Sequence, residues 1–115
     1  MTDDRTARIR ALNDAFRRAI GSGQSLGKFY MTSGVAGHGP AFTAKVIAAV
    51  VAFDAFDADI DPYGEHDMVR VVVDGIRVWG KIDYYHKADP DLGAEDPADA
   101  GTTERVMTLL LPEEY

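Results

Sequence analysis

The 115-residue sequence contains no cysteine. This absence excludes a disulfide framework, a thiolate zinc site and a cysteine nucleophile at the same time. No apolar run approaches the roughly 20 residues that a membrane helix needs, and the N-terminal TDDRTARIR has no apolar core of the signal-peptide type. We therefore expect a soluble, cytoplasmic protein that does not contact a membrane.

Basic residues are scarce in the second half of the chain. Residues 1–53 contain seven Lys or Arg against three acids, whereas residues 54–115 contain five against sixteen, and the net charge is -7. Proteins bind nucleic acid largely through Lys and Arg side chains that neutralise phosphates, so a direct nucleic-acid partner is not expected. A basic protein surface suits this charge better.

Apolar residues are plentiful enough for one core. The sequence is 46% hydrophobic and 10% aromatic, and its length predicts a single domain over residues 1–115.

Two amphipathic helices are predicted. Thr2 is suited to cap a helix over residues 3–20, in which Ile9 and Phe16 belong to a stripe at 3.6-residue spacing. We expect the five arginines of this helix to form its solvated face. A second helix is predicted to begin at Pro40 or Ala41 and to end near Phe56, after a glycine-rich loop over residues 33–40.

Four strands are predicted, over residues 28–32, 68–73, 76–84 and 104–111. Asp74-Gly75 between the second and third is a strong hairpin signal. Alternation places Val69, Val71 and Val73 on the core side of their strand. The predicted class is therefore α+β, with two helices packed on one face of a mostly antiparallel four-stranded sheet, in the order helix-strand-helix-strand-strand-strand.

Most chemically versatile side chains lie within or beside residues 61–85. Asp57, Asp59 and Asp61 match three positions of a calcium-binding loop, but Pro62 and Met68 occupy positions that require Gly and Glu. An irregular divalent-metal site remains an alternative, either as a binding module or as a small metal-dependent hydrolase centred on the GEHD segment. Its candidate ligands are Asp59, Asp61, Glu65, His66 and Asp67.

The three neighbours Glu65, His66 and Asp67 converge on one atom only if the chain turns, because adjacent side chains of an extended segment point to opposite faces. Gly64 could provide that turn. The interpretation we favour is a structural His66 that fixes its loop onto the sheet. No serine lies in a nucleophile-elbow pattern, so we predict a protein that is not an enzyme and needs no cofactor.

Several sequence segments together resemble an uncharacterised family. These segments are IRALNDAFRR, FDAFDADIDPYGEHD, WGKIDYY, DPADAGTTERVMTLLL and PEEY. The chain resembles an alphaproteobacterial family of this length, often encoded on plasmids and other mobile elements, that is classed as a domain of unknown function. The resemblance implies a mobile-element accessory protein rather than a metabolic enzyme.

Our functional hypothesis is a non-enzymatic acidic protein that binds the basic surface of a nucleic-acid-binding complex. An inhibitor of a restriction or CRISPR-type defence complex would act in this way. Carboxylates would supply long-range attraction, with two aromatic residues as short-range anchors, although such aromatics on strands also serve as packing residues. The predicted partner-binding residues are Asp57, Asp59, Asp61, Glu65, Trp79, Tyr85, Asp89, Asp91, Asp96 and Asp99. A homodimer formed through an exposed strand edge is compatible with this hypothesis.

Overall fold

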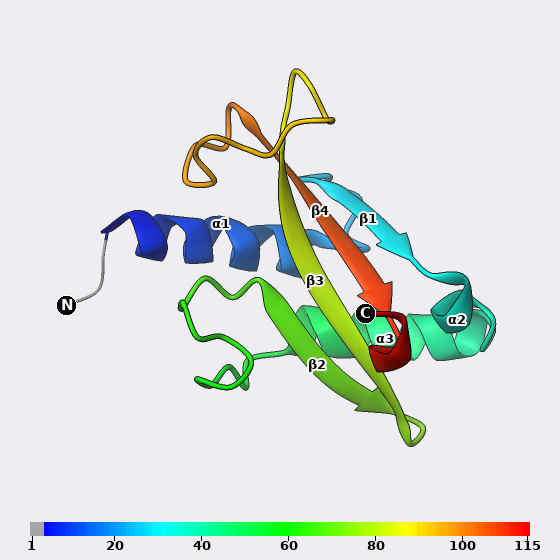
Figure 1. The fold of residues 1–115 in the computed structure, drawn as a ribbon. Helices are drawn as coiled ribbons and strands as arrows, with labels where there is room; N and C mark the ends of the chain where they lie inside the picture. The colour runs from blue at the N-terminus through cyan, green and yellow to red at the C-terminus, as the bar shows by residue number, and fades with distance from the viewer. Residues whose placement is uncertain (1–3) are drawn as a thin grey trace.

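The computed structural model describes residues 4–115, and the predicted helix cap at Thr2 lies outside the described residues. The α-helices are α1 (Asp4–Ala19), α2 (Ser33–Ala36) and α3 (Pro40–Ala52), and a short 3-10 helix, η1, spans Pro112–Glu114. The strands are β1 (Lys28–Met31), β2 (Met68–Val73), β3 (Ile76–His86) and β4 (Thr103–Leu110). Figure 1 shows their arrangement. No helix within residues 4–115 is both long and apolar enough to cross a membrane.

The four strands form one mixed sheet in the order β1-β4-β3-β2. The pairs β2–β3 and β3–β4 are antiparallel, whereas β1 runs parallel to β4, with Lys28 opposite Val106. The α+β class and the four strands are thus confirmed. The parallel pair was not predicted, and the predicted order omits α2 and η1.

The β2–β3 hairpin forms as its sequence predicts. Asp74 and Gly75 both have positive φ, 52° and 77°, as a two-residue type I′ turn requires. Val69, Val71 and Val73 are buried, while the intervening Arg70 and Val72 are exposed. The alternation of side chains along the strand therefore predicts correctly which residues of β2 face the core.

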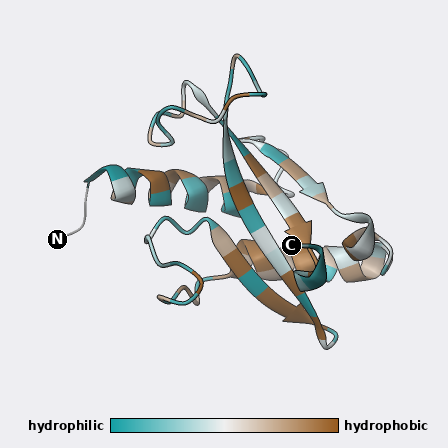
Figure 2. Ribbon diagram, in the orientation of Figure 1, coloured by the Kyte–Doolittle hydropathy of each residue, from teal (hydrophilic) through white to brown (hydrophobic). Residues whose placement is uncertain are grey.

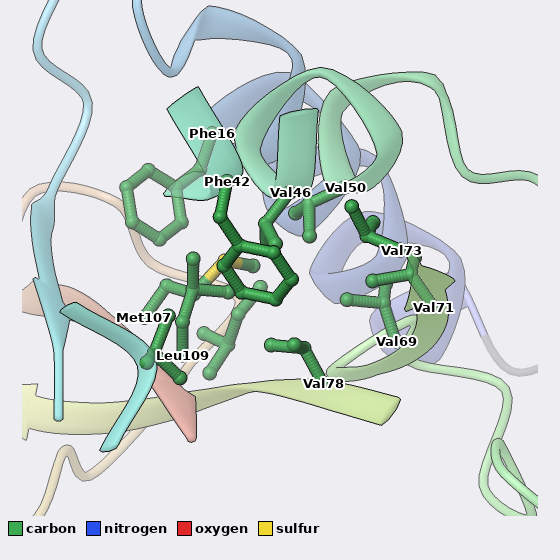
Figure 3. Close-up of a cluster of buried hydrophobic side chains, with 12 residues drawn as sticks. Phe16, Phe42, Val46, Val50, Val69, Val71, Val73, Val78, Met107 and Leu109 are labelled. Carbon is green, nitrogen blue, oxygen red and sulfur yellow. The ribbon is translucent and has the colours of Figure 1, made fainter. Parts of the chain in front are cut away.

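The core lies between one face of the sheet and the helices α1 and α3. Figure 3 shows Phe16 of α1 and Val46 of α3 gathered over Val78 of β3 and Met107 of β4. Brown hydrophobic segments of β2, β4 and α3 come together there in Figure 2. On the other face of the sheet, Trp79 of β3 contacts Tyr115, which follows η1, with ring centroids 5.6 Å apart.

Two predicted boundaries are wrong for reasons of local hydrogen bonding. Residues 33–36 form the short helix α2 rather than a loop, because the Thr32 hydroxyl accepts a hydrogen bond from the Val35 amide and Val35 is fully buried. Helix α3 ends at Ala52 rather than near Phe56. Phe53 is extended (φ -64°, ψ 131°), and its carbonyl accepts a hydrogen bond from Arg17 of α1 at 3.1 Å.

Candidate functional site

Helix α1 lies between two acid-rich loops, residues 53–67 and residues 87–102 (Figure 1). Arg5 pairs with Asp96 at 3.0 Å, and Nε of Arg8 donates to the Ala98 carbonyl at 2.7 Å, so both contact the 87–102 loop. On the other side, Nε of Arg10 donates to the Gly64 carbonyl at 2.6 Å. The predicted solvated arginine face therefore needs correction, because three of its arginines attach the loops to α1.

Arg17 departs furthest from that prediction, since it is 1% exposed. Its Nη1 donates to Asp14 at 2.8 Å and its Nη2 to the Phe53 carbonyl. The guanidinium also lies 5.2 Å from the ring centroid of Phe56. A buried arginine is tolerated when a carboxylate and a carbonyl receive its donors. Its Nε is the one buried side-chain nitrogen or oxygen without a hydrogen-bond partner in the described chain.

His66 is held between two carboxylates. Its Nδ1 is 2.8 Å from Oδ1 of Asp14, and its Nε2 is 3.6 Å from Oδ2 of Asp61. Its backbone amide also donates to Asp61 at 3.0 Å, and its ring stacks on Phe56. Gly64 and His66 have positive φ, 71° and 56°, so the predicted turn occurs here. His66 is thus a structural residue, but it fixes the loop onto α1 rather than onto the sheet.

A second polar network beneath this loop joins α1 to β3 and β4. The Asn13 side chain is fully buried, and its Nδ2 donates to the Glu65 carbonyl at 3.0 Å and to the Tyr84 hydroxyl at 2.8 Å. Its Oδ1 accepts from Nε of Arg105 at 2.7 Å. The Tyr84 hydroxyl donates in turn to the Glu65 carboxylate at 2.9 Å. Burial, with the nearby Glu65, raises the pKa of Tyr84, which keeps the hydroxyl protonated as a donor.

The side chains of the GEHD segment diverge. Glu65 bonds Tyr84, whereas His66 lies against Asp14 and Asp61. Burial, assisted by neighbouring carboxylates, raises the pKa of Asp67. Among the five candidate metal ligands, Asp61 and His66 contact each other, with Nε2 of His66 3.6 Å from Oδ2 of Asp61. Within residues 4–115, no group of three or more His, Asp or Glu side chains is placed to hold a metal ion.

The predicted partner-binding carboxylates separate into those bound by other side chains and those that are exposed without such a partner in the described chain. The Asp61 side chain is 5% exposed, Glu65 bonds Tyr84, and Asp96 pairs with Arg5. These three carboxylates therefore stabilise the loops. The exposed members on the two loops are Asp57, Asp59, Asp89, Asp91 and Asp99. Three of these five also accept a backbone amide two residues further on, which is the geometry of an Asx turn.

The two predicted aromatic anchors differ in position: Tyr85 forms an isolated β-bridge with Gly93 of the 87–102 loop, whereas Trp79 contacts Arg70 and Tyr115. Trp79 is half-buried, with the Arg70 guanidinium 4.5 Å from its ring centroid and Tyr115 on its edge. Tyr85 is 36% exposed and lies near the end of β3. On the same face of β3, Lys81 pairs with Asp83 at 3.1 Å.

Each acidic loop instead presents another large apolar residue. Tyr63 in the 53–67 loop is 80% exposed, and Leu92 in the 87–102 loop is 55% exposed. Tyr63 lines an open cleft of about 730 Å³ that also includes Arg10 and His66. Sequence reasoning missed both residues. The available signal was a single apolar residue between turn-forming neighbours, in DPYG and DLG, where it cannot reach the core.

The fold and this site together define a small α+β protein with a mixed four-stranded sheet and two acidic loops held by arginines of α1. Residues 31–114, about three quarters of the chain, match the family described as "Protein of unknown function (DUF3768)". The chain belongs to this family, which confirms the expected domain of unknown function. No curated protein and no solved structure matches the sequence.

Proposed function

We propose that the protein is a non-enzymatic binding protein whose two acidic loops engage a basic surface of a protein partner. The observation that carries this proposal is the exposure of Tyr63 and Leu92, one on each loop, among exposed carboxylates. Large exposed apolar side chains surrounded by polar residues are typical anchors of protein interfaces.

The charge of the loops supports the same kind of partner. Lys87 is the only Lys or Arg in the two loop sequences. The exposed aspartates Asp57 and Asp59 on one loop, and Asp89 and Asp91 on the other, make no ion pair with a described residue. Carboxylates of this kind attract a basic surface over a Debye length of about 8 Å at physiological ionic strength, and they increase the association rate.

A basic surface that normally holds nucleic acid fits this charge. Carboxylates on two loops would occupy positions that phosphates otherwise take, and the apolar side chains would provide contacts that do not depend on salt. Restriction and CRISPR-type defence complexes in the cytoplasm are partners of this class. The protein would act by occupying the groove rather than by binding nucleic acid itself.

A pull-down from host lysate at low salt, with mass-spectrometric identification, tests the proposal. We expect it to recover a basic, nucleic-acid-binding protein, and we expect competing DNA or RNA to release that protein. Tyr63→Ser with Leu92→Ser should weaken capture at every salt concentration. Asp57→Asn, Asp59→Asn, Asp89→Asn and Asp91→Asn together should weaken capture most at low salt. Asn preserves the Asx-turn acceptors, so the loops should stay folded.

A matched control removes charge at the other end of the sheet. Asp74→Asn keeps a turn residue suited to type I′ geometry, and Glu113→Gln lies in η1, away from both loops. This pair should leave capture unchanged. Recovery of no basic protein, or equal loss of capture with the control pair, would overturn the proposal.

A further inference from the structure

A separate cavity of about 480 Å³ lies between α1, the segment that leads into β1, and the start of β4. Its volume is within the range of small-molecule pockets, about 300–1,000 Å³. Leu12 of α1 and Leu26 form part of its wall, and Leu26 is 45% exposed. The cavity therefore has an apolar side that a ligand could cover.

The charged lining of this cavity is positive, although the whole chain carries a charge of -7. Lys28, Lys87 and Arg105 line it, against the single carboxylate of Glu104. Glu104 lies 3.8 Å from Lys28. Lys87 makes no ion pair with any residue in the described part of the chain.

Arg105 is the distinctive member of this lining, because it is only 3% exposed. Its Nε donates to Asn13 and its Nη2 to the Pro97 carbonyl, which leaves Nη1 without a hydrogen bond to a described residue. Since the one buried unpartnered side-chain nitrogen or oxygen in residues 4–115 is Nε of Arg17, Nη1 of Arg105 is accessible to solvent. Arg105 is also one of the residues that line this cavity.

The surroundings of Arg105 provide little negative charge. No Asp or Glu carboxylate in the described chain lies within ion-pair distance of the Arg105 guanidinium. Burial lowers the pKa of Arg105, and the effects of Tyr84 and Glu65 oppose that shift only in part. A buried cation without a paired carboxylate is unfavourable, and an anion bound at Nη1 would relieve that cost.

We propose that this cavity binds a small organic carboxylate. The carboxylate group would meet Nη1 of Arg105 and the ammonium group of Lys87, and the apolar part of the ligand would lie against Leu12 and Leu26. This site is separate from the exposed tips of the acidic loops, and the proposal does not depend on the proposed function.

Titration of the full chain with phenylacetate, followed in proton–nitrogen NMR correlation spectra, tests this site. Phenylacetamide serves as the neutral analogue and inorganic phosphate as the purely ionic one. We expect saturable shifts of the Leu26, Gly27 and Thr103 amides with phenylacetate. Phenylacetamide and phosphate should each bind about tenfold or more weakly than phenylacetate. Phenylacetamide lacks the negative charge for Arg105 and Lys87, and phosphate lacks the apolar part that would lie against Leu12 and Leu26.

The variants for this test are limited to lysines, because Arg105 also holds Asn13 and Pro97. Lys87→Gln should weaken phenylacetate binding by about two- to fivefold, as expected for one exposed charge. Lys45→Gln, a matched change in α3 where Lys45 pairs with Asp74, should leave it unchanged. Equal binding of the amide, equal binding of phosphate, absence of saturation, or equal effects of the two lysine variants would each overturn the proposal.

Discussion

The imidazole of His66 lies flat against the ring of Phe56, with 3.7 Å between the ring centroids and 3° between the ring planes. Phe56 also lies next to the buried guanidinium of Arg17, and His66 contacts Asp14, the carboxylate that Arg17 bonds. These four side chains join the 53–67 loop to α1 as one unit.

Replacement of His66 should therefore loosen this loop. His66→Ala removes the stack and both carboxylate contacts, so we expect the free energy of unfolding to fall by about 1–3 kcal/mol. Urea unfolding measures this change. His38→Ala is the control, because His38 is exposed and has a ring contact with Phe42 at 4.8 Å. Its effect should stay within about 0.5 kcal/mol, and equal losses in the two variants would contradict the structural role of His66.

Substitutions in the hydrogen-bond network around Asn13 should lower the free energy of unfolding by different amounts. Asn13→Ala leaves Nε of the buried Arg105 unpaired and removes three hydrogen bonds, so we expect a loss of about 2–4 kcal/mol. Tyr84→Phe removes one hydroxyl and should cost about 1–2 kcal/mol. Both values come from equilibrium denaturation at pH 7. A Tyr84→Phe loss equal to that of Asn13→Ala would show that the contact with Arg105 contributes little.

Ionisation of Asp14 should stabilise the fold, whereas ionisation of Asp67 should destabilise it. Burial acts against ionisation of Asp14, but hydrogen bonds from Arg17 and His66 hold its pKa below 3.8. Its contribution to stability is therefore present above pH 3.8 and is lost as the pH falls through the folded-state pKa. Burial raises the pKa of Asp67 above 3.8, so its carboxylate destabilises the fold once the pH exceeds that raised value.

The isosteric amides test these signs. At pH 7, Asp14→Asn should lower the free energy of unfolding and Asp67→Asn should raise it, each by about 0.5–1.5 kcal/mol. Both differences should shrink as the pH falls below 3.8, where the carboxyls become protonated. Denaturant unfolding over a pH series measures them. Changes of the same sign at pH 7 would refute the assignment.

The arginines of α1 should differ according to their contacts. Arg10→Ala removes the hydrogen bond to the Gly64 carbonyl, so we expect a loss of about 0.5–1.5 kcal/mol. Faster hydrogen exchange of the Gly64 and His66 amides should accompany it. Arg18→Ala changes an exposed residue of the same helix and should leave both quantities nearly unchanged. Equal exchange rates in the two variants would argue against loop anchoring by Arg10.

Local signals account for the parts of the fold that were predicted. The β2–β3 hairpin depends on Asp74-Gly75 and on alternation within single strands, so neighbouring residues suffice to specify it. The end of α3 depends on Arg17, which lies far away in the sequence and binds the Phe53 carbonyl. The parallel β1–β4 pair likewise joins residues near opposite ends of the sequence, and no local pattern specifies it.

The site was predicted less completely for the same reason. His66 could be recognised as a structural residue, but its partner Asp14 and the buried Asn13 belong to a helix distant in sequence. The acidity of the loops was visible in the composition, whereas the arginine contacts that fix them depend on packing. Tyr63 and Leu92 did have a local signal, since turn residues flank both.

The position of β4 between β1 and β3 also affects how the protein folds. Phe29 pairs with Met107 and Met31 with Leu109, so β1 has no strand neighbour until residues 103–110 have been synthesised. Pairing between strands so distant in sequence carries a large loop-closure cost and slows folding. Until translation reaches β4, the apolar side chains of β1 and one edge of β3 stay uncovered in the nascent chain. The complete sheet therefore forms only after translation has passed residue 110, and the incomplete nascent chain exposes the surfaces that chaperones recognise.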